Sequence, residues 1–188
     1  GPLDLLSGPL DGVTVRITLG LEGEPLMVDA MHPCGCYHMF FPTQGVTVKP
    51  APDNAGEWAF TPKTLPLRTA DDRLVVGIAS ASHDVVAVHV EPAANAQENQ
   101  GEIAMAMHDD ATLQSLPRPS GGRQSMYGLD GVVRGTQRLE RYLFWPMGIN
   151  DPGAMRQWGR HATAFVGRRH FDDAFLLDLR FELPRAGP

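Results

Sequence analysis

Apolar and polar residues alternate along the first two thirds of the chain, and this pattern restricts the fold more than any other feature of the sequence. From Val13 to Leu21, every second residue is Val, Ile or Leu, and the residues between them are Thr, Arg or Gly. Successive side chains of a strand point to opposite faces of a sheet, so this alternation predicts a half-buried antiparallel strand. A second strand is expected from about Leu26, after the turn-forming residues 22–25. Shorter alternating segments predict further strands at Val46–Val48, Trp58–Phe60, Leu74–Ile78, Val86–Val90 and Ile103–Met107.

Short strands at this spacing indicate a mainly β fold. We expect an antiparallel β-sandwich-like domain over residues 1–115 and a small α-containing C-terminal part over residues 116–188. The chain of 188 residues contains 20 glycines and 16 prolines, which favour frequent turns over long helices. No apolar run approaches the roughly 20 residues that a membrane-spanning helix requires.

The C-terminal part is expected to be an arginine-rich α+β extension whose last strand joins the core of the first part. A Pro/Gly/Ser-rich segment at residues 116–122 is typical of a linker. Helical spacing of apolar residues predicts a helix over 136–145, and Asp151-Pro152 is typical of the start of another helix. Alternation from Phe175 to Leu183 predicts the terminal strand.

One segment of the first part, Gly56-Glu57-Trp58-Ala59-Phe60-Thr61-Pro62, carries a Trp-x-Phe-x-Pro pattern before Leu65-Pro66 and a strand beginning near Arg73. In these residues the chain is similar to bacterial immunoglobulin-like repeats over about a quarter of its length. The resemblance implies a β-sandwich and carries no function.

A cluster of four metal-binding residue types lies between the second and third expected strands. His32, Cys34, Cys36 and His38 fall within seven consecutive positions, and the cysteines are the only two of the chain. Thiolate and imidazole are ligands that bind zinc or copper, and the nearby Met31 shifts the preference slightly toward copper. The cluster predicts a zinc or copper ion as the cofactor of this chain.

The spacing of the cluster requires the chain to bend if all four donors share one ion. In a regular strand, alternate residues lie about 6.6 Å apart, whereas the donors of one zinc ion lie within roughly 4 Å of each other. Pro33 and Gly35 are the residues that favour such a bend. In a second arrangement, only the two cysteines of the cluster bind the ion, and distant histidines complete the site. The candidates for this role are His83, His89, His108, His161 and His170.

Two other interpretations of the cluster remain open. Cys34 and Cys36 can form a strained, easily reduced disulfide with a structural or redox role. Alternatively, the cysteines and histidines are buried without any ligand, as is common for both residue types.

The charges of the chain are divided unevenly, although the net charge is only −6. Residues 1–117 contain 5 Lys/Arg and 15 Asp/Glu, and residues 118–188 contain 11 Lys/Arg and 7 Asp/Glu. The arginines can bind an acidic protein partner or face the acidic part of their own chain, within one molecule or across a homodimer. Nucleic acid is not expected as a partner, because acidic residues are interleaved and no stacking array of aromatic residues accompanies them. The arginines in question are Arg134, Arg138, Arg141, Arg156, Arg160, Arg168 and Arg169.

The sequence contains no phosphate-binding glycine loop, no His-Glu-x-x-His and no Gly-x-Ser-x-Gly motif. We therefore expect a metal-binding protein or an accessory subunit of the cell envelope, periplasmic or extracellular rather than cytoplasmic. One alternative is a protein-interaction module that docks through its arginine-rich C-terminal region. A further alternative is a metal-dependent enzyme, which requires an open coordination position and a pocket. Separately, the run Arg168–Asp173 places His170 near acidic and basic residues, as in a general acid/base site or in a solvated turn before the last strand.

Overall fold

The computed structural model describes a set of β-strands with short helical turns. The described residues are 12–32, 37–55, 58–66, 68–69, 71–95, 102–106, 108–129, 131, 133–136, 139, 142 and 175–184. Most of the strands predicted from alternation are present, and the fold is mainly β with antiparallel pairing between the named strands.

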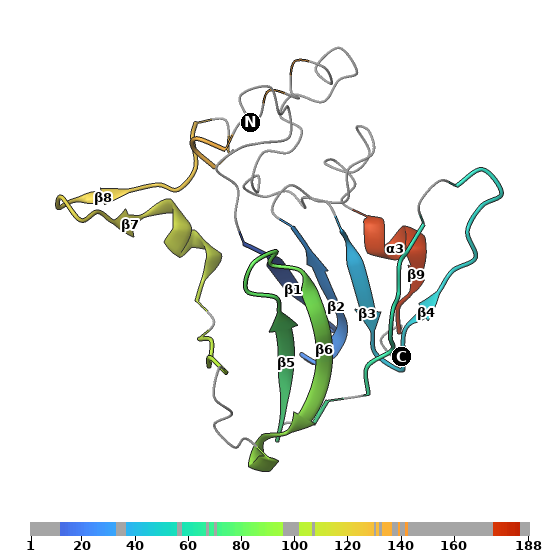
Figure 1. Ribbon diagram of the computed structural model, residues 1–188. Coiled ribbons are helices and arrows are strands. Elements are labelled where there is room, and N and C mark those ends of the chain that lie inside the picture. Colours follow the sequence, from blue (N-terminus) through green and yellow to red (C-terminus); the bar gives the residue numbers. More distant parts are fainter. Residues whose placement is uncertain are drawn as a thin grey trace.

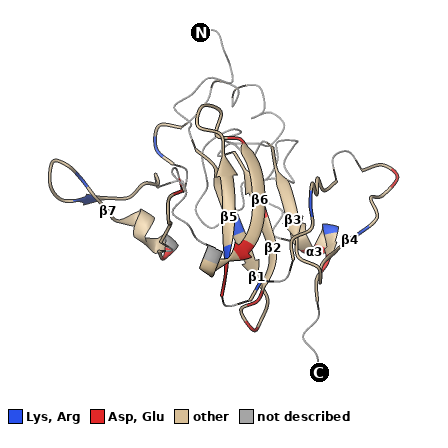
Figure 2. Cartoon of the chain, turned by 60° about the horizontal axis from the view of Figure 1, so that its bottom comes forward, with Lys and Arg blue, Asp and Glu red and all other residues tan. Residues whose placement is uncertain are grey.

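The centre of the fold is a three-stranded antiparallel sheet in the order β1-β2-β3. Its strands are β1 (Thr14–Leu19), β2 (Pro25–Met31) and β3 (Met39–Pro42). Every residue of β2 after Pro25 is buried, because β2 has a hydrogen-bonded neighbour on each side and packed side chains on both faces. These three strands carry only two charged residues, Arg16 and Asp29, in an otherwise uncharged sheet (Figure 2).

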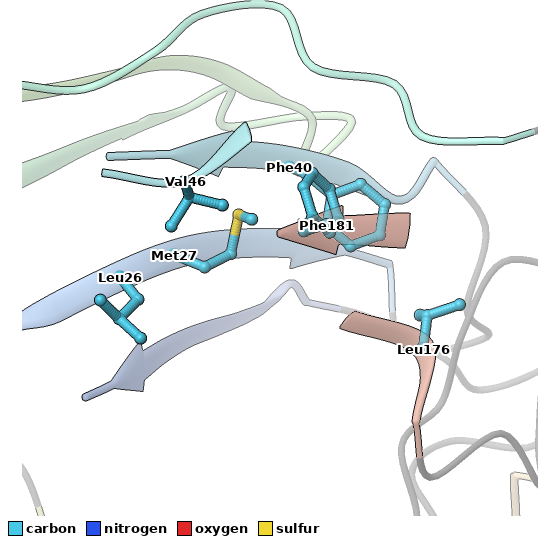
Figure 3. Close-up of a cluster of buried hydrophobic side chains, with 6 residues drawn as sticks. All are labelled: Leu26, Met27, Phe40, Val46, Leu176 and Phe181. Carbon is cyan, nitrogen blue, oxygen red and sulfur yellow. The ribbon is translucent and has the colours of Figure 1, made fainter. Parts of the chain in front are cut away.

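One face of the sheet packs against the C-terminal residues of the described chain. Here α3 (Leu176–Arg180) leads into β9 (Phe181–Glu182), which pairs with β4 (Thr47–Val48). The ring of Phe181 lies 5.1 Å from the ring of Phe40 on β3, between centroids. Figure 3 shows the cluster of buried side chains that results: Leu26, Met27, Phe40, Val46, Leu176 and Phe181.

The opposite face of the sheet packs against a hairpin formed by β5 (Asp72–Ile78) and β6 (Val85–Pro92). Val28 of β2 and Phe41 of β3 are directly opposite each other in the register, and both contact the second core cluster. That cluster also contains Val88 of β6 and Leu65. Figure 1 shows the hairpin lying across the sheet, so the sheet is covered on both faces.

The remaining described elements lie away from this core. They are two 3₁₀ turns, η1 (Ala93–Asn95) and η2 (Asp110–Gln114), and a small hairpin of β7 (Leu116–Pro117) and β8 (Arg123–Gln124). Figure 1 shows β7 and β8 as an arm that extends from the body. The segment predicted as a linker, residues 116–122, therefore contains β7 and the turn that joins β7 to β8.

Three of the predicted strands are wrong in whole or in part, and Trp58–Phe60 is one of them. Leu176–Arg180, predicted as part of a terminal strand, is helical, and only Phe181–Glu182 is extended. Leu176 and Arg180 are both buried and are spaced by four residues, so the sequence satisfies a helical pattern as well as an alternating one. Residues 102–106 form no strand, and Ile103 and Met105 are 86% and 87% exposed. Their alternation has no core against which to pack.

Other predictions have partial outcomes or remain predictions. Trp58–Phe60 is not a strand, but the amide of Phe40 donates to the carbonyl of Phe60 at 2.9 Å, which joins this segment to β3. The predicted helix after Asp151 lies outside the described residues, as does most of the helix predicted over 136–145. The division of the chain near residue 115 stays a prediction. Within the described part of the chain, no helix is long and apolar enough to cross a membrane.

We predict that Phe181→Ala lowers the free energy of unfolding by about 3 to 5 kcal/mol, because the substitution removes a buried ring from the core. The measurement is urea denaturation followed by circular dichroism. Phe175→Ala is the matched control, since Phe175 is 68% exposed and its loss should change stability by less than about 0.5 kcal/mol. Equal losses in the two variants would contradict the position of Phe181 in the core.

Candidate functional site

The predicted metal cluster lies at the connection between β2 and β3. The two strands are antiparallel and pair Ala30 with Met39, so the chain reverses direction between them. A reversal between β2 and β3 is compatible with a shared ion, and the sharing of one ion by the four donors stays a prediction. His32 and His38 stand at the two ends of the connection, and Cys34 and Cys36 lie outside the described residues.

Tyr37, directly before His38, adopts a φ of 56°. This left-handed conformation is uncommon for a bulky residue other than glycine, and it is maintained only where the surrounding structure requires it. The ring of Tyr37 contacts the ring of His32 at 5.0 Å between centroids. The strained residue thus directly precedes His38 in the chain and contacts the ring of His32 in space.

His38 belongs to a buried network with Asp29 and Arg16 on the central sheet. The Nε2 of His38 lies 2.8 Å from Oδ1 of Asp29, and these two side chains are 2% and 1% exposed. At the same oxygen, Nε of Arg16 donates to Oδ1 at 2.9 Å and Nη2 donates to it at 2.6 Å, and this Nη2 lies 3.4 Å from Nε2 of His38. The register of β1 and β2 places Arg16 directly opposite Asp29, so the sheet itself aligns the pair.

The network determines which nitrogen of His38 carries a proton. Asp29 accepts hydrogen bonds as a carboxylate, so the close Nε2 of His38 must be the protonated nitrogen that donates to it. In the neutral imidazole, Nδ1 then has a free lone pair. This Nδ1 is buried and has no hydrogen-bond partner among the described residues. His38 therefore has one nitrogen oriented by a carboxylate and one nitrogen available to a metal ion or a proton.

The environment favours neutral His38 and ionised Asp29. Burial lowers the pKa of His38, and the positive charges of Arg16 and Arg180 lower it further, although the hydrogen bond and charge of Asp29 oppose this. Burial alone would raise the pKa of Asp29, but the hydrogen bonds and charges of His38 and Arg16 outweigh it, so the pKa is lowered overall. Both directions agree with the tautomer derived from the geometry.

His32 has a different environment at the other end of the connection. Its Nε2 lies 3.2 Å from Oδ1 of Asp84, at the tip of the β5–β6 hairpin, but the atoms are not oriented for a hydrogen bond. This Nε2 is also buried, and among the described residues no side chain or backbone group hydrogen-bonds to it. Each end of the predicted cluster thus presents a buried imidazole nitrogen with unused bonding capacity.

Both histidines line one cavity of about 960 Å³. The cavity extends from the end of the sheet to the segment 58–60 and to Arg180 of α3, whose guanidinium lies 5.5 Å from the centre of the Trp58 ring. Most of its other lining side chains are apolar or aromatic: Val13, Ala30, Met31, Tyr37, Met39, Phe40, Trp58, Ala59, Phe60 and Val85.

The additional ligand candidates are not gathered at this site. His83 lies in the β5–β6 turn with a φ of 57°, His89 lies on β6 near Glu91, and His108 is exposed. None of the three lines the cavity, and His161 and His170 lie outside the described residues. Within the described ranges, no three His, Cys, Asp or Glu side chains form a group that could hold a metal ion.

The arginine-rich surface predicted for the C-terminal part is described at one position. Arg134 is structured, and its Nε donates to the carbonyl of Tyr127 at 3.0 Å. The other six arginines of that group lie outside the described residues, so docking of an acidic partner or of a second copy stays a prediction.

Sequence reasoning missed Asp29 and Arg16. A signal for both was present, because Asp29 is the single charged residue in the apolar segment Leu26–Met31. A carboxylate at such a position requires a buried partner, and Arg16 is the one charged residue of the neighbouring strand. The pairing itself depends on the register, which alternation alone does not specify.

No family model, curated protein or solved structure matches the chain. The functional interpretation therefore rests on the geometry of the residues.

We predict that Arg16→Met destabilises the protein by about 3 kcal/mol, since it leaves the Asp29 carboxylate buried without its main cationic partner. Arg73→Met is the matched control and should destabilise the protein much less, because Arg73 pairs with the more exposed Glu91 and Glu102 and water screens such surface pairs. Urea denaturation of both variants at neutral pH makes the comparison. Losses of similar size would show that the Arg16–Asp29 pair has no special role.

We predict that the metal-free protein loses stability in two steps as the pH falls. The folded-state pKa of His38 is lowered, so below pH 6.5 the unfolded chain binds a proton that the folded chain does not, and stability falls. The folded-state pKa of Asp29 is also lowered, so a second loss begins below about pH 3.8. Unfolding free energies measured with a chelator present, from about pH 8 to pH 3, test this. His38→Gln should remove the upper step, and an unchanged profile would refute the assignment.

Proposed function

We propose that this protein binds a zinc or copper(I) ion at the β2–β3 connection, with His38 as a ligand through Nδ1. The observation that carries the proposal is the buried Nδ1 without a partner, on a ring whose other nitrogen donates to a buried carboxylate. Metal-binding histidines almost always have such an outer partner, which selects the tautomer and orients the ring. A buried polar atom without a partner is costly, and an ion is one group that would satisfy it.

His32 is the second ligand in this proposal. It stands at the other end of a connection in which the chain reverses, and its Nε2 is also buried without a hydrogen bond. Binding of an ion would satisfy both imidazole nitrogens at once. Oδ1 of Asp84 lies 3.2 Å from the same Nε2 of His32, so this carboxylate would lie next to the bound ion.

Cys34 and Cys36 complete the proposed donor set on the basis of the sequence. They occupy the connection between the two histidines, and thiolates with imidazoles are a donor set that suits zinc and copper(I). The cell-envelope location and the accessory role expected from the sequence stay predictions. The competing possibilities of a Cys34–Cys36 disulfide and of buried, unliganded side chains are outcomes of the experiment below.

The experiment is a titration of the reduced, metal-free protein with cobalt(II), which reports thiolate and tetrahedral coordination through its visible and near-ultraviolet absorption. We expect one equivalent to bind, with thiolate-to-cobalt bands that zinc removes. Cys34→Ser/Cys36→Ser should lose these bands, and His38→Ala should bind at least tenfold more weakly. His108→Ala is the matched control, because His108 is exposed and does not line the cavity.

Three results would contradict the proposal. The first is the absence of stoichiometric cobalt or zinc binding by the reduced wild-type protein. The second is equal affinity in the wild type and the double serine variant. The third is a thiol count of zero before reduction, together with metal binding that is the same before and after reduction. This result would identify Cys34–Cys36 as a disulfide rather than a ligand pair.

A further inference from the structure

The cavity beside His38 is much larger than a metal site requires. Its volume of about 960 Å³ lies at the upper end of the range of roughly 300 to 1,000 Å³ that is typical of small-molecule pockets. A metal ion at the β2–β3 connection would use His32 and His38, whereas the wall formed by Trp58, Ala59 and Phe60 carries no metal-binding side chain. That part of the cavity needs a different explanation.

Hydrogen bonds hold the wall formed by Trp58, Ala59 and Phe60 in place. The Nε1 of Trp58 donates to the carbonyl of Lys49 at 2.8 Å, and the carbonyl of Trp58 accepts a hydrogen bond from Arg180. The carbonyl of Phe60 accepts from the amide of Phe40 on β3 at 2.9 Å. The wall is therefore tied at both ends to the sheet and to α3, so the cavity is formed before any ligand enters, which reduces the cost of binding.

The chemistry of the lining favours an uncharged aromatic ring. Trp58, Phe60, Phe40 and Tyr37 supply aromatic surface, and aromatic pairs in offset or tilted geometry attract each other beyond simple burial. The thioethers of Met31 and Met39 make favourable contacts with ring edges.

The charged residues of the lining do not favour either sign. Apart from the two histidines, the charged residues in the described part of the lining are Arg180 and Asp84, one of each sign, so these residues give a charged ligand no consistent attraction. An ionic ligand would also lose its hydration against a mostly apolar wall, which is unfavourable.

We propose that this cavity binds a small, uncharged aromatic molecule, with its ring against Trp58 and Phe60. The proposal goes beyond metal binding and does not depend on it, because the wall residues are not metal ligands. Water against the side chains of Trp58 and Phe60 makes few hydrogen bonds, and an aromatic ring that displaces it from this wall gains affinity.

The experiment uses the full chain with a chelator present and follows three probes by fluorine NMR: fluorobenzene, para-fluorobenzoate and para-fluorobenzylammonium. We expect saturable binding of fluorobenzene with a Kd on the order of 1 mM, in keeping with the few atoms of the probe. Each charged probe should bind at least tenfold more weakly. Preferred binding of either charged probe, or no saturable binding of fluorobenzene, overturns the proposal.

A pair of matched variants locates the binding site. Phe60→Ala should weaken fluorobenzene binding about fivefold, by removing one aromatic contact. Phe60 is 64% exposed, so its loss should leave the fold intact, which circular dichroism checks. Phe175→Ala removes an equally exposed ring that does not line the cavity, and it should leave binding unchanged. Equal effects of the two variants would overturn the placement of the ring.

The outcome is separable from that of the metal proposal. The cobalt titration contains no aromatic probe, and the fluorine experiment contains no metal. Failure of fluorobenzene to bind therefore leaves the metal result standing, and failure of cobalt to bind leaves the cavity result standing.

Discussion

The buried carboxylate of Asp29 is the constraint on which the rest of the structure depends. It lies on the central strand of the sheet, and its charge must be matched within a few ångströms by Arg16 and stabilised by a hydrogen bond from neutral His38. A slip of one residue between β1 and β2 would move Asp29 into the apolar layer formed by Val28 and Phe41, so the ion pair and the hydrophobic layers select the same register. A buried carboxylate without partners would destabilise the protein, but the carboxylate of Asp29, paired with Arg16, favours a single register of β1 and β2.

The same carboxylate links the fold to the candidate site. Because Asp29 accepts the proton-bearing nitrogen of His38, the orientation of the ring is determined by the sheet and not by any ligand. Phe40 supports the ring from the same face, at 4.1 Å between centroids. The lone pair of Nδ1 is therefore positioned in advance, and a ligand of that nitrogen does not need to order the side chain. Tyr37, next to His38, has a strained backbone conformation, which indicates that contacts with the surrounding structure determine the backbone at this residue.

The sequence predicts a secondary-structure element reliably only where its pattern of apolar residues fits a single kind of element. Alternation correctly predicted β1, β5 and β6, and the turn before Leu26 correctly predicted the start of β2, because each of these segments has a neighbouring strand and a core. The pattern near Leu176 fits both a helix and a strand, and packing against Phe181 selected the helix. The bend expected between His32 and His38 follows from a shared ion, and that shared ion stays a prediction. The Arg16–Asp29–His38 network could not be predicted from spacing, since its three members come from β1, β2 and the residue before β3, and their relative register is a property of the folded sheet.

The pairing of β4 with β9 has a consequence for how this protein is made. Thr47 lies opposite Glu182, so one edge of the core joins residues that are far apart in the chain. On a ribosome, the cluster around Met27 and Phe40 would lack the Phe181 ring until the last part of the described chain has emerged. Contacts between such distant residues form slowly, because a long loop must close first. The sheet would therefore spend most of synthesis with one apolar face uncovered, an interval in which chaperones would have access to it.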